Sequence, residues 1–173
     1  GLFYRLYHRL QSRKGTRLEH YDKFFYPLDG IDDRNRLYGR AGFLQYQVVL
    51  PMETGLDTIR SIVKLLRSKG CRPCLAVLKL FGDKGRGLLS FPARGFTLAL
   101  DLPVRGRLLK ALEEADRITL EGGGRVYLAK DSRMKPETVR AMYPRLEEWS
   151  AARRKADPEG RLSSDLARRL EIQ

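Results

Sequence analysis

Four polar side chains recur where the surrounding sequence is typical of β-strands: Gln45, Gln47, Lys79 and Thr97. Side chains alternate between the two faces of a strand, so the two glutamines share one face of residues 43–50 (FLQYQVVL). In residues 96–102 the even positions are the apolar set that must face the core, which turns Thr97 to the opposite side. If these strands pair, their polar side chains form one surface. That surface is either a binding surface or an ordinary solvated sheet face, and the spacing does not separate the two.

Lys79 is the most unusual of the four. It interrupts residues 74–81 (CLAVLKLF), a nearly continuous apolar strand that the sequence predicts to be buried on both faces. A lysine in such a strand either extends its apolar stem along the sheet edge to solvent or pairs with a functional group. The pattern favours the first alternative.

The elements that position these residues follow from the periodicity of the sequence. Residues 43–50 are aromatic and β-branched and end at Pro51, which predicts a strand. Thr54 followed by Asp57 resembles a capping box, and it begins an amphipathic helix that ends at Gly70. The elements predicted after this helix are a strand at 74–81, a strand at 96–102, a helix at 108–118 that ends at three glycines (122–124), and a strand at 125–130.

The order strand, helix, strand, strand, helix, strand is that of the ferredoxin-like split βαβ arrangement. It predicts an α+β fold with an antiparallel sheet and helices on one face. After residue 130, Pro136 and Pro144 each open a helix and a third helix begins near Ser163. We therefore expect a ferredoxin-like sheet followed by a helical C-terminal segment.

Several motifs resemble known sites but occur in the wrong context. Residues 71–74 (CRPC) follow a predicted helix and precede a strand, the reverse of a redox motif, so both thiols are expected to be structural. The glycine-rich residues 82–87 do not open a helix, which favours a hairpin connection over a phosphate loop. The residues without metal-ligand spacing are Asp29, Asp32, Asp33, His8 and His20. We expect no metal site.

The chain has 34 Lys and Arg against 21 Asp and Glu, a net charge of +13. This charge indicates an anionic partner, such as nucleic acid, lipid phosphates, a phosphorylated substrate or an acidic protein segment. An RNA-binding ferredoxin-like module is one alternative, because Arg94-Gly95-Phe96 opens a strand as the RNA-recognition signature does. The stacking aromatics of that signature are missing, so we do not expect nucleic-acid binding.

The cysteines, the apolar stretches and the first residue indicate the compartment of the protein and whether the sequence is a fragment. Two cysteines give no disulfide framework, which favours a reducing compartment, and no apolar stretch is long enough to span a bilayer. The chain begins with Gly1 rather than methionine and has no secretory signal. Residues 1–23 have no clean period and stay unassigned. We expect the chain to be part of a longer protein.

A more specific signal comes from several long segments that occur in the same order as in one enzyme superfamily. They are residues 25–30 (FYPLDG), 35–51 (NRLYGRAGFLQYQVVLP), 78–82 (LKLFG), 96–103 (FTLALDLP), 128–133 (LAKDSR), 142–145 (MYPR), 153–158 (RRKADP) and 164–170 (SDLARRL). From about residue 24 to residue 170 the chain resembles the C-terminal part of the FAD-dependent oxidases of the vanillyl-alcohol oxidase and aldonolactone oxidase superfamily. Within it, the likeness is strongest to the oxidases of decaprenylphosphoryl ribose.

The resemblance implies a division of the chain and roles for its residues. Residues 24–125 would be a portion of the substrate-binding domain, and residues 126–173 would complete an FAD domain whose N-terminal FAD-binding half is absent from this sequence. The implied site residues are Gln45, Gln47, Lys79 and Thr97 for the substrate, Tyr127 and Lys130 for the cofactor, and Lys130 for catalysis. Thr97 and Ala99 stand where mycobacterial relatives carry asparagine and cysteine, so the substrate pocket is expected to differ in detail.

The implied reaction is the oxidation of a secondary sugar hydroxyl to a ketone by hydride transfer to FAD, on a polyprenylphosphoryl pentose. A cation such as Lys130 would stabilise the reduced flavin and polarise the substrate hydroxyl. A soluble sugar-lactone oxidase of the same superfamily is the alternative enzyme. The resemblance also implies a reductase partner for epimerisation and a cytoplasmic protein, peripheral at the inner membrane, where positive charge suits lipid phosphates. We expect these 173 residues alone to be inactive.

Overall fold

The computed structural model describes residues 6, 8–10, 12, 16, 18–26, 30, 32–33, 36 and 38–172, so the predicted turn residue Asp29 lies outside the described part. The chain forms two compact units, residues 1–34 and residues 35–173. In the first unit, the exposed helix α2 (Tyr21–Phe25) begins after His20, whose side chain accepts a hydrogen bond from the amide of Asp22. The elements described below belong to the second unit.

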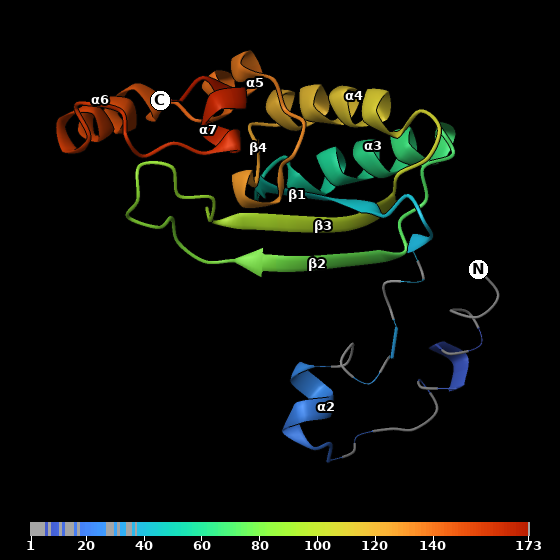
Figure 1. Cartoon of the computed structure of the whole chain (residues 1–173). Helices are drawn as coiled ribbons and strands as arrows, with labels where there is room; N and C mark the ends of the chain where they lie inside the picture. Colours follow the sequence, from blue (N-terminus) through green and yellow to red (C-terminus); the bar gives the residue numbers. More distant parts are fainter. Residues whose placement is uncertain are drawn as a thin grey trace. The chain divides into compact units, whose positions relative to one another are not determined.

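The second unit contains a sheet, two long helices and a helical C-terminal segment (Figure 1). In chain order its elements are β1 (Phe43–Pro51), α3 (Gly55–Ser68), β2 (Leu75–Phe81), β3 (Gly95–Pro103), α4 (Leu108–Glu121), β4 (Arg125–Val126), the 3-10 turn η2 (Leu128–Lys130), α5 (Pro136–Met142), α6 (Leu146–Ala156) and α7 (Asp165–Leu170). The predicted order of strands and helices is confirmed, and so is the α+β fold with helices at the C-terminus.

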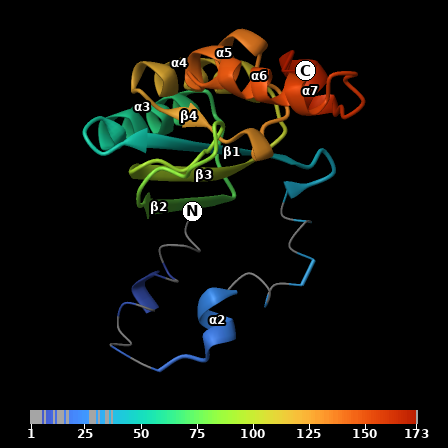
Figure 2. The same cartoon turned by 90° about the vertical axis from the view of Figure 1, so that its left-hand side faces the viewer.

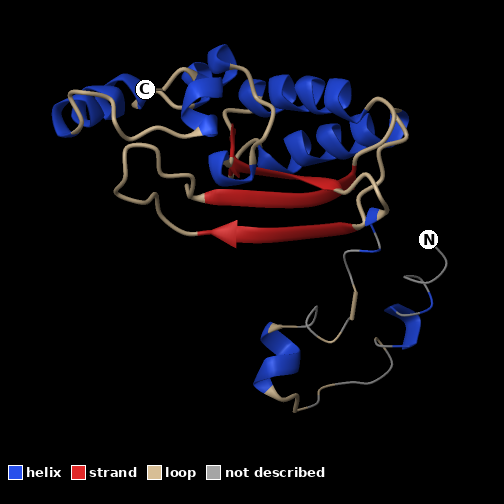
Figure 3. Cartoon of the chain, in the orientation of Figure 1, coloured by secondary structure: helices blue, strands red, loops and turns tan. Residues whose placement is uncertain are grey.

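The four strands form one antiparallel sheet in the spatial order β2-β3-β1-β4. β1 and β3 pair along nine residues each, from Phe43 opposite Pro103 to Pro51 opposite Gly95. The two long helices α3 and α4 cover one face of this sheet, which gives two layers in both views (Figures 1 and 2). Figure 3 shows the same layers with the strands in red and the helices in blue.

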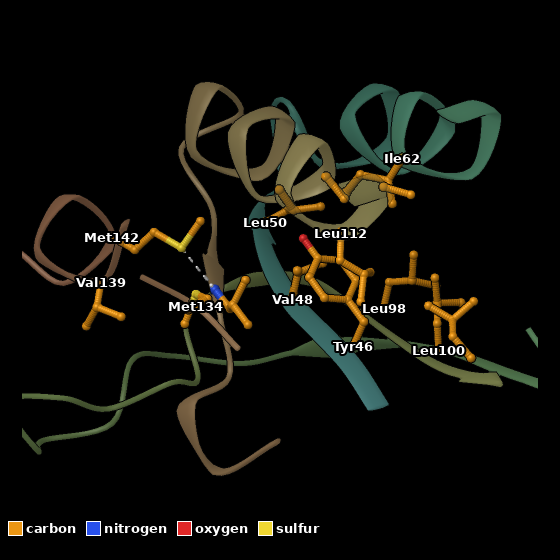
Figure 4. Packing of buried hydrophobic residues seen from close by; sticks show 14 of the residues in the cluster. Tyr46, Val48, Leu50, Ile62, Leu98, Leu100, Leu112, Met134, Val139 and Met142 are labelled. Atoms are coloured by element: carbon orange, nitrogen blue, oxygen red, sulfur yellow. Dashed lines mark hydrogen bonds between the residues drawn. The ribbon is translucent and has the colours of Figure 1, made fainter. Parts of the chain in front are cut away.

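The hydrophobic core lies between the sheet and these helices. Its side chains come from alternate positions of β1 and β3 and from the inner faces of α3 and α4; those labelled in Figure 4 include Val48, Leu50, Leu98, Leu100, Ile62 and Leu112. Burying a side chain of this size contributes about 1.5–3 kcal/mol. The even-numbered leucines of β3 therefore face the helices, as the sequence predicts.

β2 departs from the predicted strand that is buried on both faces, and that prediction is wrong. β2 is an edge strand, and Leu78 and Leu80 are 54% and 64% exposed. α3 packs on β1 and β3 and α4 packs on β1, so the helix layer is centred on the other strands. A continuous apolar run cannot tell an edge strand from a central one, because the position in the sheet depends on the other strands.

The last strand is shorter than the predicted strand at 125–130. Only its first two residues pair with β1. The amide of Tyr127 still donates to the carbonyl of Gln47 (2.8 Å), but the amide of Lys130 turns back to the carbonyl of Tyr127 (3.1 Å). The chain therefore leaves the sheet in the turn η2, directly beside β1.

The capping box predicted at Thr54 is also wrong. Thr54 is the residue before α3, but its side chain makes no capping hydrogen bond. Its hydroxyl donates instead to the carbonyl of Gly122 (2.7 Å), and Asp57 forms an ion pair with Arg60. Thr54 thus connects the start of α3 to the end of α4.

The C-terminal helices are attached to β4 by two residues that follow one another in the chain. The hydroxyl of Tyr143, which is 2% exposed, donates to the carbonyl of Val126 (2.6 Å). The amide of Val126 donates to the sulfur of Met142 (3.4 Å), the dashed contact at Met142 in Figure 4. The end of α5 is therefore held against the last strand through both backbone groups of Val126.

Replacing Tyr143 with phenylalanine tests this attachment. Loss of one buried hydrogen bond is expected to lower the free energy of unfolding by about 1 kcal/mol at neutral pH. Burial raises the pKa of Tyr143 from its ordinary 10.0 to about 12. The neutral phenol therefore contributes fully to the free energy of unfolding below pH 10, and this contribution is lost as the pH rises through 12. The difference in free energy of unfolding between the variant and the wild type should narrow above pH 10. Urea unfolding across this range measures it, and a difference that does not change with pH contradicts the prediction.

Candidate functional site

The four polar side chains predicted from the sequence lie on the sheet face opposite the helices. The strand pairing places Gln47 opposite Ala99 and Lys79 opposite Thr97. Directly opposed residues of an antiparallel pair point to the same face. We call this surface the polar face: Gln45, Gln47, Lys79, Thr97 and Asp101. The sheet thus brings together side chains from three neighbouring strands.

Asp101 organises one end of the polar face. Its carboxylate, in a residue that is 5% exposed, accepts hydrogen bonds from Nε2 of Gln45 (2.7 Å) and from the hydroxyl of Tyr38 (2.8 Å). The ring of Tyr38 stacks on Phe43 at 3.9 Å between centroids. These contacts turn the amide nitrogen of Gln45 toward β3. Tyr38 could not be predicted as part of this contact, because its partner Asp101 is distant in the chain.

Gln47 and Thr97 form a second pair on the same face. Nε2 of Gln47 donates to the hydroxyl of Thr97 (3.2 Å). Gln47 is half-buried, whereas Thr97 is only 1% exposed. Of these two side chains, Gln47 is therefore the one that solvent reaches.

An aromatic cluster explains why Thr97 is buried on a face that no helix covers. The ring of Phe91, in the loop between β2 and β3, stacks on Tyr127 at 4.4 Å and meets Phe81 edge-on at 5.9 Å. Nε of Arg125 also donates to the carbonyl of Phe91 (3.1 Å). Phe81 ends β2 and Tyr127 follows β4, so the two rings come from opposite sides of the strand that carries Thr97, and Phe91 closes this end of the polar face.

Lys130 is exposed at the end of the turn η2. The next residue, Asp131, has a side chain that is 1% exposed, and its carboxylate accepts hydrogen bonds from the amide of Met134 (3.0 Å) and from Nη2 of Arg169 in α7 (2.8 Å). The amide of Arg133 donates to the same carboxylate (3.1 Å). The carboxylate of Asp131 therefore binds Arg169 and two backbone amides and not Lys130. No carboxylate in the described part of the chain forms an ion pair with that lysine.

A second ion pair fixes the segment after this turn. The guanidinium of Arg133 binds the carboxylate of Asp116 in α4 through two hydrogen bonds of 2.7 Å, and both side chains are largely buried. Burial acts to lower the pKa of Arg133, but the hydrogen bonds and charge of Asp116 raise it above its usual value. Arg133 also lies over the ring of Tyr46, with the guanidinium carbon 5.6 Å from its centroid. The pair keeps the segment that carries Lys130 and Asp131 against α4.

The structure separates the predicted residues into a centre and two edges. Gln45, Gln47 and Thr97 lie on the two central strands, and Lys79 lies on the edge strand β2. Tyr127 and Lys130 lie beyond the opposite edge of β1, in and before the turn η2. At the usual strand spacing of about 4.8 Å, β1 and β2 are about 10 Å apart. The polar face is therefore about as wide as a sugar ring with a linked group.

In the part of the chain that the structure describes, no group of three or more His, Cys, Asp and Glu side chains is placed to hold a metal ion. Burial raises the pKa of the Cys71 thiol, which makes it a poorer nucleophile. Among the described helices, none is both long and apolar enough to cross a bilayer.

Known proteins resemble this chain over most of its length. Residues 96–170 match the family described as D-arabinono-1,4-lactone oxidase. The chain is 42% identical over 167 residues to the decaprenylphosphoryl-beta-D-ribose oxidase of Mycolicibacterium smegmatis, covering 96% of the chain and 36% of that relative. It is 46% identical over 115 residues to a Streptomyces coelicolor protein described as an uncharacterized protein in the mprA 5' region, covering 66% and 31%. The chain spans about a third of the length of these relatives.

Replacing Asp131 with alanine tests whether this carboxylate holds the turn that carries Lys130. Two backbone amides lose their acceptor, and Arg169 loses a partly buried ion pair while it keeps the carbonyl of Met134, so the free energy of unfolding should fall by about 3 kcal/mol. The amides of Arg133 and Met134 should exchange hydrogen faster. Asp165→Ala is the matched control, because Asp165 pairs with Arg168 but is fully exposed and should change stability by less than about 0.5 kcal/mol. If the two substitutions lower the free energy of unfolding equally, Asp131 does not hold the turn that carries Lys130.

Proposed function

We propose that the chain, whose residues 96–170 match the D-arabinono-1,4-lactone oxidase family, is the substrate-binding and C-terminal portion of an FAD-dependent oxidoreductase. The proposed reaction converts a secondary sugar hydroxyl to a ketone. The proposed substrate is a polyprenylphosphoryl pentose, in keeping with the substrate in the name of the mycobacterial relative. The observation that carries the proposal is the polar face, with an exposed lysine in a fixed turn at its edge.

The residues at this edge fit a flavin. Bound FAD supplies the acceptor for the hydride that leaves the sugar carbon. Lys130 contributes an exposed positive charge, which is not neutralised by Asp131 because that carboxylate is engaged with Arg169. Such a cation stabilises the negative charge that develops during reduction and can also polarise the substrate hydroxyl. Tyr127, held by stacking on Phe91, is the second proposed cofactor contact.

The polar face would hold the sugar. Gln45 is oriented by Asp101 and Gln47 by Thr97, so both amides are fixed before a ligand arrives, which lowers the entropy lost on binding. Thr97 is buried, so its contribution to substrate binding would be made through Gln47 as a positioning residue. Lys79 adds a cation at the opposite edge, which suits a substrate that carries a phosphate.

The wider organisation is proposed on the same basis. Residues 24–125 would belong to a substrate-binding domain, and residues 126–173 would complete an FAD domain. The change from strands to helices after Val126 supports this division. The strand order β2-β3-β1-β4 with two crossover helices supports the ferredoxin-like class of the sheet. A reductase partner for epimerisation and association with a membrane surface are further parts of the proposal, and the charge of +13 supports the second.

Two alternatives differ in what the protein would bind. A sugar-lactone oxidase is supported by the description of the matching family, and it would reduce its flavin with a free sugar or lactone. An RNA-binding module would need exposed aromatic rings on the sheet. Phe96, the aromatic residue of the candidate RNA signature, packs against the hydrophobic core. This position favours the enzyme over the RNA-binding module.

Replacing Lys130 with alanine in the FAD-loaded protein tests the proposal. Loss of the cation should slow flavin reduction by substrate about a hundredfold or more. The melting temperature should stay within a degree or so, because exposed side chains away from buried networks contribute little to stability. Stopped-flow absorbance of the flavin measures the rate, and circular dichroism measures the melting.

Two further variants complete that experiment. Lys135→Ala removes an exposed lysine five positions later, outside the proposed site, and should leave the rate of flavin reduction unchanged. Lys130→Arg keeps the charge and should restore part of the rate. If Lys130→Ala reduces its flavin as fast as wild type, Lys130 has no catalytic role.

A further inference from the structure

A hollow lies at the end of the sheet where α3 leads into β2 and β3 leads into α4. Figure 1 shows both connections at this end, and the amide of Cys74 donates to the carbonyl of Asp101 across it (2.9 Å). The hollow has a volume of about 300 Å³. Four of its nine lining residues are cationic and none is acidic: Lys69, Arg72, Arg105 and Arg107. We call it the basic hollow.

Most of this charge is not balanced by nearby carboxylates. Nζ of Lys69 lies 2.9 Å from Oε1 of Glu114 and forms an ion pair. Arg72, Arg105 and Arg107 are exposed, and none of them forms an ion pair within the described residues. Three like charges around one hollow repel one another, so the arrangement favours the entry of an anion.

The backbone beneath these arginines is fixed. Gly70, with φ of +73°, reverses the chain after α3, and the amide of Cys71 donates to the carbonyl of Leu66 (2.8 Å). Gly106, with φ of +53°, makes a similar reversal before α4. Leu102, which is 1% exposed, forms part of the floor. The arginine stems therefore start from ordered positions on a buried base.

The chemistry of the hollow identifies the class of ligand. The planar guanidinium group matches the oxygens of phosphate and binds two of them at once. The first turn of α4 begins at the hollow without an acidic residue, so the positive end of its dipole acts in the same direction. We infer that the basic hollow binds the phosphate group of an anionic ligand. The group belongs either to a free phosphate compound or to a lipid headgroup at a membrane surface.

The basic hollow is separate from the polar face, and its assignment does not rest on the proposed function. Leu102 alternates with Asp101 and so lies on the helix side of the sheet. A larger hollow of about 390 Å³ at the other end of β1 is lined by Arg94 and Arg125. That hollow has two cationic lining residues rather than four, and Arg125 there already donates to the carbonyl of Phe91, which leaves fewer donors for an anion.

A pair of double variants of the full protein tests the inference. Arg105→Gln with Arg107→Gln removes two charges from the hollow. Lys84→Gln with Arg86→Gln removes the same charge from the exposed loop between β2 and β3 and serves as the matched control. Each protein is titrated with inorganic phosphate by calorimetry at constant ionic strength. Each is also sedimented with vesicles of phosphatidylglycerol and phosphatidylcholine, and with phosphatidylcholine vesicles alone.

The two measurements distinguish the two sources of phosphate. Saturable binding of inorganic phosphate that the hollow variant weakens about tenfold or more, and the control does not, supports a site for a free phosphate compound. The same loss seen only with phosphatidylglycerol vesicles supports a lipid headgroup. Equal weakening by the two variants means general charge attraction and overturns the inference. No binding of either probe by the wild-type protein also overturns it.

Discussion

Nine residues of β1 pair with nine residues of β3, and this ladder decides which side chains meet the helices. Leucines and valines at alternate positions form the floor of the core, so the residues between them must face the other way. Gln45, Gln47 and Thr97 are among those residues. A slip of one residue in this pairing would turn one of the two strands over, so it would either bury the two glutamines of β1 under α3 and α4 or expose the leucines of β3. The packing of the core and the composition of the polar face are therefore fixed by the same register.

The polar face is ordered by contacts made before any ligand is present. Asp101 holds Gln45, and Thr97 holds Gln47, in both cases across the β1 and β3 pair. The turn beside β1 is ordered differently, by one ion pair with the C-terminal segment and one with α4. Arg169 of α7 holds Asp131, and Asp116 of α4 holds Arg133. Helices α4 and α7 together thus determine the position of a turn that begins next to Gln47.

The order of the elements could be predicted because it rests on local periodicity. The alternation in β1 and β3 and the helical spacing in α3 and α4 are each readable within about ten residues. The errors concern contacts between distant residues. The hydroxyl of Thr54 donates a hydrogen bond to the carbonyl of Gly122 and not to an amide of its own helix. The edge position of β2 depends on where β1 and β3 pair. The polar face was predictable from the alternation of side chains along the strands. The hydrogen bond from Tyr38 to Asp101 and the stacking of Phe91 on Tyr127 were not, because each contact joins a loop to a distant residue.

The edge position of β2 gives Lys79 a second physical role. An edge strand with exposed Leu78 and Leu80 presents backbone groups and apolar surface to any other strand, including that of another copy of the chain. A charged lysine within such a strand opposes this pairing, because two copies aligned there would bring ammonium groups together. Removing Lys79 would then promote self-association as well as change the polar face. The solubility of the protein and the charge of the polar face therefore depend on the same side chain.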